Sequence, residues 1–417
     1  MTDGTGARRG VTRRMKLTIA IVAAALVLAG GGAAAALWVL PRSTEAAAPT
    51  ATQTPRPTAT PTPSATPTPE VDQPVRVIAM GDMLPHDSVN ANATAADGTI
   101  DYAQFFTGIS TQLDAADVTF CNQEVPSAGV DFGISGYPTF NAPTEFARDL
   151  REGAGCDLVN TATNHTADKG TAGIAATREV WDGLAPAIVS GANRSAAEQR
   201  TVPVFEQDGI TIALVSFAEY SNAPIDEVSL NMMGDTALVT ELMAQARDAA
   251  DVVIVSAHWG TEDSHEVNDQ QRAFAQQVAD LGADVVVGTG PHVLQPTAWL
   301  DRADGGRALV WYSIGNMLST QLTLDQRTGV IAGFELARDE AGAVQVTKPT
   351  GILTYMHYDW TAEQEAANDL MARTNLSLTP LAGADELLQR TRFGVSAADQ
   401  VAAASAILGP DVTVLAE

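Results

Sequence analysis

Cysteine is scarce in this sequence, with only Cys121 and Cys156 present. Two isolated cysteines form neither a zinc-binding pattern nor the dense disulfide framework of a small secreted domain. Each lies near one end of a predicted strand. Two arrangements therefore remain open: a single disulfide, if those strand ends meet in space, or two buried free thiols.

Basic side chains are also few beyond the N-terminal region. The 417 residues carry 24 Lys and Arg against 50 Asp and Glu, a formal net charge of −26. The first 74 residues hold seven of the basic and four of the acidic side chains, which leaves 17 basic and 46 acidic ones, a net charge of −29, after position 74. A domain this acidic repels phosphate backbones, so we expect no nucleic-acid partner.

Charged residues are missing altogether between Lys16 and Arg42. The segment 17–40, LTIAIVAAALVLAGGGAAAALWVL, is apolar over 24 residues, which is long enough to span a bilayer. The basic stretch RRGVTRRMK assigns residues 1–16 to the cytoplasm. We therefore predict a single-pass signal-anchor in the cell membrane and an extracellular domain. The alternative is a cleaved signal peptide, after which the domain is secreted.

The next segment, residues 41–74, is rich in Pro, Thr and Ala and shows no apolar periodicity. Proline removes backbone donors and favours the extended polyproline II conformation. The segment is therefore predicted to be a disordered, semi-rigid stalk that holds the domain away from the membrane.

From Val75 onward, short apolar strands alternate with helical segments such as 269–281, DQQRAFAQQVADL. The strands are predicted in VRVIAMGD, ADVTFCNQE, CDLVNTATNH, ITIALVSFAEY, DVVIVSAHWGTED, ADVVVGTGPHVLQ and RALVWYSIGNM. Continuous runs of Val, Ile and Leu indicate an α/β domain whose sheets are covered on both faces. We predict one such domain over residues 75–354 and a helical C-terminal extension, residues 355–417, packed on it.

Most of the predicted strands end in a residue that can bind a metal ion. The candidates are Asp82, Glu124, Asn164, His258 and His292. The carboxyl ends of strands in an α/β sheet open into a common crevice, so we expect these side chains to lie together. Carboxylate, amide and imidazole ligands suit Mn²⁺, Zn²⁺ or Fe²⁺, and one or two such ions would favour hydrolysis or group transfer.

Each candidate also has a purely structural interpretation. Asn164 could cap the following helix, and His165 could bond locally to Asp168. His258 could pack in the core beside Trp259. The occurrence of all the candidates at strand ends nevertheless favours a shared site.

Seven motifs occur in an order that resembles the poly-γ-glutamate capsule biosynthesis family, the CapA-type proteins. They are GDMLPHDSV, NQE, SGYPTFNAP, NTATNHTADKG, SAHWGTED, GTGPHVLQP and YSIGNML, within residues 75–320. That family is similar to the calcineurin-like metallophosphatases. The resemblance therefore implies a four-layer α/β/β/α sandwich with its site at one edge.

The resemblance also implies a role for each matching residue. It implies metal ligands at Asp82, Glu124, Asn164, His258 and His292. His165 matches the histidine that donates a proton, with Asp168 orienting it. The remaining candidates line the pocket: His86, Asn122, Trp259, Glu262 and Asn316.

Two positions depart from the family pattern. Gly290 stands where the first histidine of His-Pro-His is expected, and Thr163 replaces the first asparagine of Ala-Asn-Asn-His. Glycine offers no side-chain ligand. The second metal position is therefore either incomplete or completed by another group, such as His86 or His265.

By this resemblance, the chain is predicted to be a membrane-anchored, metal-dependent hydrolase or transferase. Its expected substrate is a cell-envelope polymer or a γ-glutamyl peptide, and capsule synthases are its expected partners. The alternative is a non-catalytic factor that binds capsule polymer or assists assembly, with a degenerate metal site. A third interpretation, a strict phosphatase or nucleotidase, rests on analogy of fold alone.

Overall fold

The computed structural model describes residues 73–416. The predicted cytoplasmic segment 1–16, the membrane span 17–40 and nearly all of the stalk 41–74 lie outside the described residues. Among the helices of residues 73–416, none is both long and apolar enough to cross a membrane.

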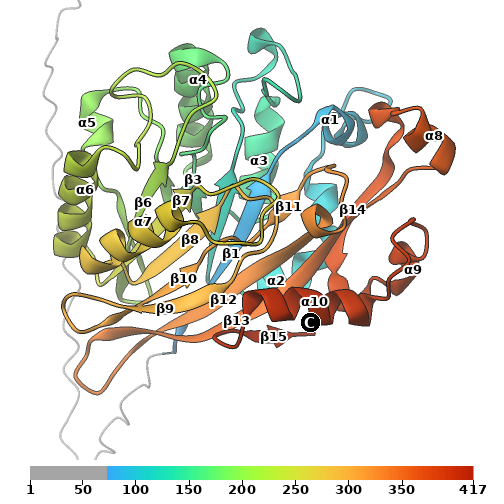
Figure 1. Cartoon of the computed structure of the whole chain (residues 1–417). Coiled ribbons are helices and arrows are strands. Elements are labelled where there is room, and N and C mark those ends of the chain that lie inside the picture. The colour runs from blue at the N-terminus through green and yellow to red at the C-terminus, as the bar shows by residue number, and fades with distance from the viewer. Residues whose placement is uncertain (1–72, 417) are drawn as a thin grey trace, which may run out of the picture. The chain divides into compact units, whose positions relative to one another are not determined.

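Two β-sheets form the centre of this region (Figure 1). The first sheet contains β1 (Val75–Met83), β2 (Val118–Gln123), β3 (Leu158–Asn160), β4 (Ile188–Ser190), β11 (Asn316–Leu318), β12 (Thr328–Arg338), β13 (Val344–Asp359), β14 (Thr374–Pro380) and β15 (Thr413–Leu415). The second sheet contains β5 (Val204–Gln207), β6 (Ile210–Ala218), β7 (Val252–His258), β8 (Val285–Thr289), β9 (Thr297–Asp301) and β10 (Arg307–Trp311).

Helices and turns connect these strands. The α-helices are α1 (Asp87–Ala93), α2 (Ser110–Asp114), α3 (Thr144–Glu152), α4 (Gly170–Leu184), α5 (Ala196–Gln199), α6 (Thr236–Ala249), α7 (Asp269–Asp280), α8 (Ala362–Ala366), α9 (Asp385–Leu388) and α10 (Ala397–Leu408). The 3₁₀ turns are η1 (Ala103–Ile109), η2 (Val130–Phe132), η3 (Asp325–Arg327), η4 (Leu370–Ala372) and η5 (Leu381–Gly383).

Each sheet has a parallel portion. The first sheet runs in the order β14-β13-β12-β1-β2-β3-β4, with β1 to β4 parallel and β12 antiparallel to β1. The second runs β5-β6-β7-β8-β10-β9, with β6, β7, β8 and β10 parallel. Parallel strands are buried on both faces, and β7 and β8 are accordingly buried along their whole length.

The two sheets pack face to face, with helices outside. One core cluster joins both sheets, for example through Val77 and Leu158 of the first and Ile254 and Val287 of the second. A second cluster lies between the first sheet and α1, α3 and α4, and a third lies between the second sheet and α6 and α7. The predicted α/β class with two sheets is thus confirmed.

The C-terminal region contributes strands as well as the expected helices. Strand β13 runs through to Asp359, β14 pairs antiparallel with its second half, and β15 pairs parallel with Thr350–Ile352 in its middle. In β14 the buried Leu376 and Leu378 alternate with more exposed residues. An alternation this short, set between helical segments, does not identify a strand from sequence alone.

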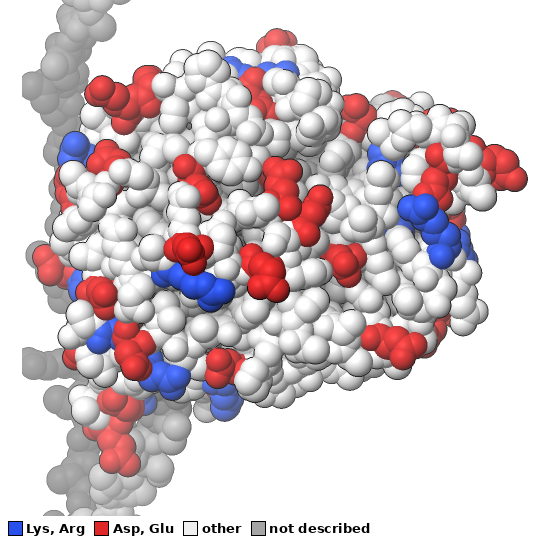
Figure 2. Space-filling view, viewed as in Figure 1, with Lys and Arg blue, Asp and Glu red and all other residues white. Residues whose placement is uncertain are grey.

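Acidic side chains are spread over the viewed face and are not gathered on one element (Figure 2). Many of the basic residues lie next to acidic ones, as in the exposed pair of Arg76 with Asp117 at 3.1 Å. The surface therefore keeps a large negative charge without forming a single acidic site.

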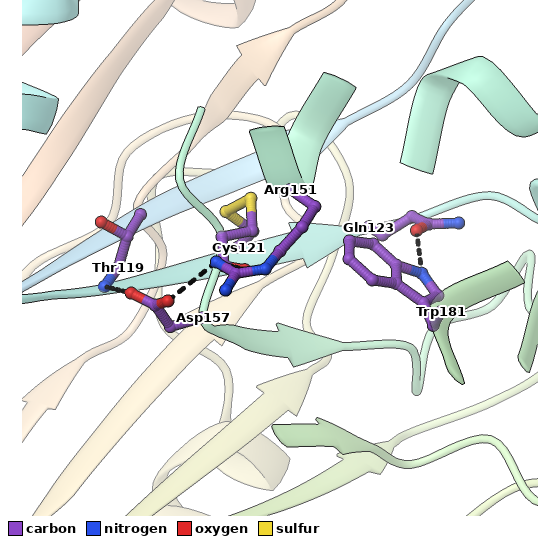
Figure 3. Close-up of a disulfide and its surroundings, with 7 residues drawn as sticks. Thr119, Cys121, Gln123, Arg151, Asp157 and Trp181 are labelled. Carbon is purple, nitrogen blue, oxygen red and sulfur yellow. Dashed lines mark hydrogen bonds and ion pairs between the residues drawn. A yellow bond between two sulfur atoms is a disulfide. The ribbon is translucent and has the colours of Figure 1, made fainter. Parts of the chain in front are cut away.

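Cys121 and Cys156 form a disulfide (Figure 3), which resolves the two arrangements that the sequence leaves open. It joins β2 to the turn before β3, with Cα atoms 5.7 Å apart. Asp157, beside it, accepts hydrogen bonds from the Thr119 amide at 3.2 Å and from Arg151 at 2.9 Å. A covalent bond and a partly buried polar cluster thus hold these two strands together.

We expect the double variant Cys121→Ser, Cys156→Ser to lose about 2–4 kcal/mol of unfolding free energy, because its unfolded chain is no longer cross-linked. Urea unfolding followed by circular dichroism measures this loss. Reductant should shift the wild-type midpoint toward that of the variant and leave the variant unchanged. A wild-type midpoint that equals that of the variant would contradict a stabilising bond.

Candidate metal site

The site forms where the carboxyl ends of parallel strands from both sheets meet. Asp82 lies near the end of β1, Asn122 in β2 and Asn160 at the end of β3. His258 and Thr289 are the last residues of β7 and β8 in the second sheet. All five side chains are buried. The two sheets therefore supply opposite walls of one site, as expected for strand ends that share a crevice.

Asp82, Glu124 and His292 form the centre of the site. Each offers one ligand atom, and these atoms all lie within 4.8 Å of one another. His292 Nδ1 is 2.9 Å from Asp82 Oδ2, and His292 Nε2 is 3.8 Å from Glu124 Oε1. This set of two carboxylates and one imidazole matches the ligands of divalent transition metals.

His258 and Asn164 adjoin this group. His258 Nε2 lies 3.0 Å from Asn164 Oδ1 and 3.8 Å from Glu124 Oε1. Its other ring nitrogen is 3.0 Å from Thr289 Oγ1, which fixes the orientation of the ring. Burial lowers the pKa of His258 to about 3, so its imidazole is neutral and able to act as a ligand.

Glu124 is the least satisfied group of the site. Its carboxylate oxygens are both buried, and neither has a hydrogen-bond partner among the described residues. Burial raises the pKa of Glu124 well above its ordinary value. An unpartnered buried carboxylate is costly, and a bound cation would remove that cost. The residues present therefore fit a divalent metal ion.

Asp82, in contrast, is held by several donors. Asn122 Nδ2 donates to Asp82 Oδ1 at 2.7 Å, and Asn160 Nδ2 donates to Asn122 Oδ1 at 2.6 Å. The Gly290 amide donates to both oxygens of Asp82 at 3.2 Å. Burial opposes ionisation of Asp82, but the hydrogen bond and the charge of His292 outweigh it and lower its pKa. Asp82 is thus kept as an oriented carboxylate.

His165 and Asp168 form a separate pair next to Asn164. His165 Nδ1 lies 2.8 Å from Asp168 Oδ2, and the Phe140 amide donates to the same oxygen at 2.7 Å. The Phe140 ring packs edge-on against His165, with centroids 4.7 Å apart. Both the carboxylate and the aromatic ring hold the imidazole in one orientation.

The residues predicted to line the pocket lie in different places in the structure. Asn122 and Asn316 contact the site, Asn316 Oδ1 lying 3.1 Å from His292 Nδ1. Trp259 instead packs in the outer core, where its indole N–H donates to the Tyr312 carbonyl at 2.8 Å. Glu262 is exposed and accepts a hydrogen bond from the Tyr220 hydroxyl at 3.4 Å.

The two histidines considered as replacements for the missing imidazole lie outside the central group. His86 Nδ1 is 3.1 Å from the Leu84 carbonyl, and burial lowers the pKa of His86 to about 3. His265 Nδ1 is 2.7 Å from the Leu294 carbonyl. Both rings are therefore engaged by backbone oxygens.

Gly290 is required by its surroundings. Its φ is +105°, and a Cβ atom there would lie 2.8 Å from the Trp259 carbonyl oxygen and 3.2 Å from His258 Nε2. No side chain fits at this position without displacing the β7 terminus. The missing histidine thus coincides with a local backbone that only glycine satisfies.

Three contributing residues were not predicted: Asn160, Thr289 and the backbone of Gly290. Asn160 and Thr289 both end a strand. The strand-end rule that selected the other candidates could therefore have found them. The amide of Gly290 carries no signal in the sequence, because its role depends on the path of the backbone.

Comparison with known proteins gives a family match and several relatives. Residues 76–321 match the family described as bacterial capsule synthesis protein PGA_cap. A PGA biosynthesis protein CapA of Bacillus subtilis is 28% identical over 193 residues, which cover 46% of this chain and 50% of that protein. A capsule biosynthesis protein CapA of Bacillus anthracis is 28% identical over 221 residues, 51% of each chain. The chain thus spans about half the length of these relatives.

Solved structures with a related arrangement are more distant. The NAD nucleotidase of Haemophilus influenzae is 13% identical with a TM-score of 0.41, over 83% of this chain and 57% of that one. A hypothetical protein from Thermus thermophilus is 17% identical with a TM-score of 0.40, over 67% of this chain and 98% of that one.

The protonation of His292 predicts a pH dependence for the metal-free protein. Burial lowers the pKa of His292, but the charges of Glu124 and Asp82 raise it to about 10 overall. A folded-state pKa above the unfolded value of about 6.5 contributes stability below pH 6.5 that is lost as the pH rises toward 10. With EDTA present, unfolding free energy should fall by up to about 1.4 kcal/mol per pH unit across this window.

Urea unfolding at pH 6.5 and pH 9.5 checks the sign of this effect. The variant His292→Gln should show a much smaller fall, because its amide does not titrate. A wild-type protein whose stability is constant or rises over this window would contradict the protonated, ion-paired histidine.

Substitution of Gly290 should lower the free energy of unfolding more than substitution of an unconstrained glycine of similar φ. Gly342 has a φ of +85° and no atom within 4 Å of a built Cβ. We expect Gly342→Ala to cost about 1 kcal/mol from backbone strain, and Gly290→Ala to cost at least about 1 kcal/mol more because of its contact with Trp259. Equal urea midpoints for the two variants would show that position 290 has room for a side chain.

Proposed function

The chain belongs to the bacterial capsule synthesis protein PGA_cap family, and on that premise we propose that it is a divalent-metal-dependent hydrolase or transferase of a cell-envelope polymer. The observation that carries this proposal is the buried carboxylate of Glu124, whose two oxygens lack partners. They face a group in which Asp82 and His292 are already oriented. A site that served only as a structural core would leave these two buried oxygens without hydrogen-bond partners, which is costly.

The residues that would hold the ion are Asp82, Glu124 and His292, with His258 and Asn164 beside them. When bound, such an ion supplies Lewis-acid stabilisation of negative charge on a phosphoryl or acyl oxygen. Asn122 and the Gly290 amide keep Asp82 in place, and Thr289 does the same for His258. The ligands are thus pre-organised by neighbours that do not themselves ligate.

His165 is assigned the proton transfer. Its Nδ1 is fixed by Asp168, so Nε2 is the nitrogen left to give a proton to a leaving group. Asn222 Nδ2 lies 3.4 Å from Nε2.

The proposed location is the outer side of the cell membrane, with the domain carried by the span at 17–40 and the stalk at 41–74. The disulfide between Cys121 and Cys156 supports an exported domain, because such bonds persist in oxidising compartments. The substrate class, an envelope polymer or γ-glutamyl peptide, follows from the names of the relatives. We propose a capsule synthase as the partner of the domain. We also propose that its sandwich of two sheets is of the metallophosphatase-like type.

A non-catalytic role in polymer binding or assembly is the second candidate. Gly290 favours it, because its packing against Trp259 leaves no space for a further imidazole ligand. A site with fewer ligands would hold one ion where a fuller set could hold two. Measurement of turnover and of metal content in the same preparation separates these two candidates.

We expect the purified protein to show Mn²⁺-dependent turnover of γ-glutamyl peptides or phosphodiesters. His165→Asn should lower kcat by about 10²–10⁴-fold with metal content unchanged, since it removes a proton donor and no ligand. Asp82→Asn should lower both metal content and turnover. The surface variant Asp304→Asn, an equal change of charge at an exposed residue, serves as the control. Bound metal without any turnover would reject the enzyme and favour the assembly role.

A further inference from the structure

Two buried arginines in the C-terminal part of the domain have no acidic partner. Arg327 is 4% exposed and Arg373 is 5% exposed, and neither forms an ion pair within residues 73–416. Arg327 donates to the Met356 carbonyl at 2.9 Å and to the Tyr355 hydroxyl at 2.7 Å. A buried guanidinium that meets only neutral groups keeps its positive charge uncompensated.

Both cations lie close to one aromatic ring, that of Tyr358. The Arg327 guanidinium is 3.9 Å from the centroid of the Tyr358 ring, and that of Arg373 is 5.6 Å from it. Burial and the charge of Arg327 lower the pKa of Arg373. The ring faces stabilise the cations in part, but they do not neutralise them.

A cavity of about 300 Å³ opens beside Arg327. Its walls include Tyr358, Trp360 and Phe393, together with Arg390 and Arg392. These residues come from the end of β13 and from the loop that follows α9, beyond the segment 76–321 that matches the family. The cavity is therefore a feature of the C-terminal region of this chain.

The cavity is positively charged in a domain that is otherwise acidic. Arg390 pairs with Asp359, and Arg392 pairs with Glu365 at 2.5 Å. Of the three guanidiniums that line the cavity, two are ion-paired and that of Arg327 is not, which leaves an excess of one positive charge. A group of blue side chains between α8 and α9 marks this region in Figure 2, seen against the red that is spread elsewhere.

We propose that this arginine-aromatic cavity binds a carboxylate of an acidic polymer chain and so holds that chain beside the metal site. A guanidinium can form two parallel hydrogen bonds with a carboxylate, and Asp359 and Glu365 already pair with Arg390 and Arg392 within the chain. The aromatic walls suit the methylene groups that carry such a carboxylate. The identity of the polymer rests on the proposed function.

The cavity is linked to the metal site through a short series of side chains. The Tyr358 hydroxyl donates to the Gln321 carbonyl at 2.8 Å, and Gln321 Oε1 accepts from Asn316 Nδ2 at 2.6 Å. Asn316 Oδ1 in turn lies 3.1 Å from His292 Nδ1. The cavity and the metal site are thus joined by three successive contacts.

Such a cavity would also allow an acidic domain to bind a polyanion despite the repulsion between their charges. A domain with a net charge of −29 repels a polyanion at distances within the Debye length of about 8 Å. Local guanidinium contacts offset that repulsion where the chain must be held. The remaining acidic surface would keep the polymer from binding elsewhere.

The test is calorimetric titration of the full-length protein with penta-γ-glutamate in the presence of EDTA. We expect saturable binding that Arg392→Gln weakens at least about tenfold, because an exposed guanidinium of the cavity is lost. Arg307→Gln is the matched control: Arg307 is also exposed and stacks on an indole, that of Trp299, at 4.9 Å in the second sheet. It should leave the affinity unchanged.

Three results would overturn the proposal. The first is an affinity for penta-γ-glutamate that is the same in wild type, in Arg392→Gln and in a second variant, Arg390→Gln. The second is equal binding of the neutral analogue in which every free α-carboxylate of penta-γ-glutamate is a carboxamide. The third is binding of tripolyphosphate without binding of the glutamate chain, which would assign the cavity to phosphate.

The titration is independent of catalysis, so the two proposals can fail separately. Binding that depends on Arg392 but is accompanied by no turnover with any metal would retain the cavity and reject the enzyme. Metal-dependent turnover without such binding would retain the enzyme and reject the cavity.

Discussion

The burial of Glu124 between two sheets is the constraint on which the site depends. Its oxygens have no donors of their own, whereas almost every neighbouring polar group has one. Asp82 is held by an asparagine and an amide, and His258 is held by a threonine. The protein therefore fixes the surroundings of one carboxylate and leaves that carboxylate without a partner of its own. This arrangement favours ligand binding and lowers the folding stability of the protein without a ligand.

Much of the fold and of the site could be predicted from the sequence, for a physical reason. Strands that are buried on both faces appear as continuous apolar runs, and their ends appear as the first polar residues after those runs. That rule selected Asp82, Glu124, Asn164, His258 and His292, which the structure brings together. Trp259, which the family resemblance places in the pocket, follows the last residue of β7, and its indole turns into the core, as its bond to the Tyr312 carbonyl shows.

The features that escaped prediction depend on the path of the backbone or on distant parts of the chain. The role of Gly290 follows from the approach of Trp259, and no local pattern reports that distance. Strand β14 is too short to be distinguished from its helical neighbours, and its position follows from pairing with β13. The pairing of Arg327 and Arg373 around Tyr358 joins three segments of chain that share no motif.

The disulfide has a consequence for motion within the site. Cys121 immediately precedes Asn122, and Cys156 lies in the turn before the strand that ends at Asn160. Asn160 donates a hydrogen bond to Asn122, which in turn donates one to Asp82. Sliding or separation of the two strands would first lengthen the hydrogen bond between the two asparagines. The covalent bond therefore limits the relative motion of β2 and β3 at the floor of the site.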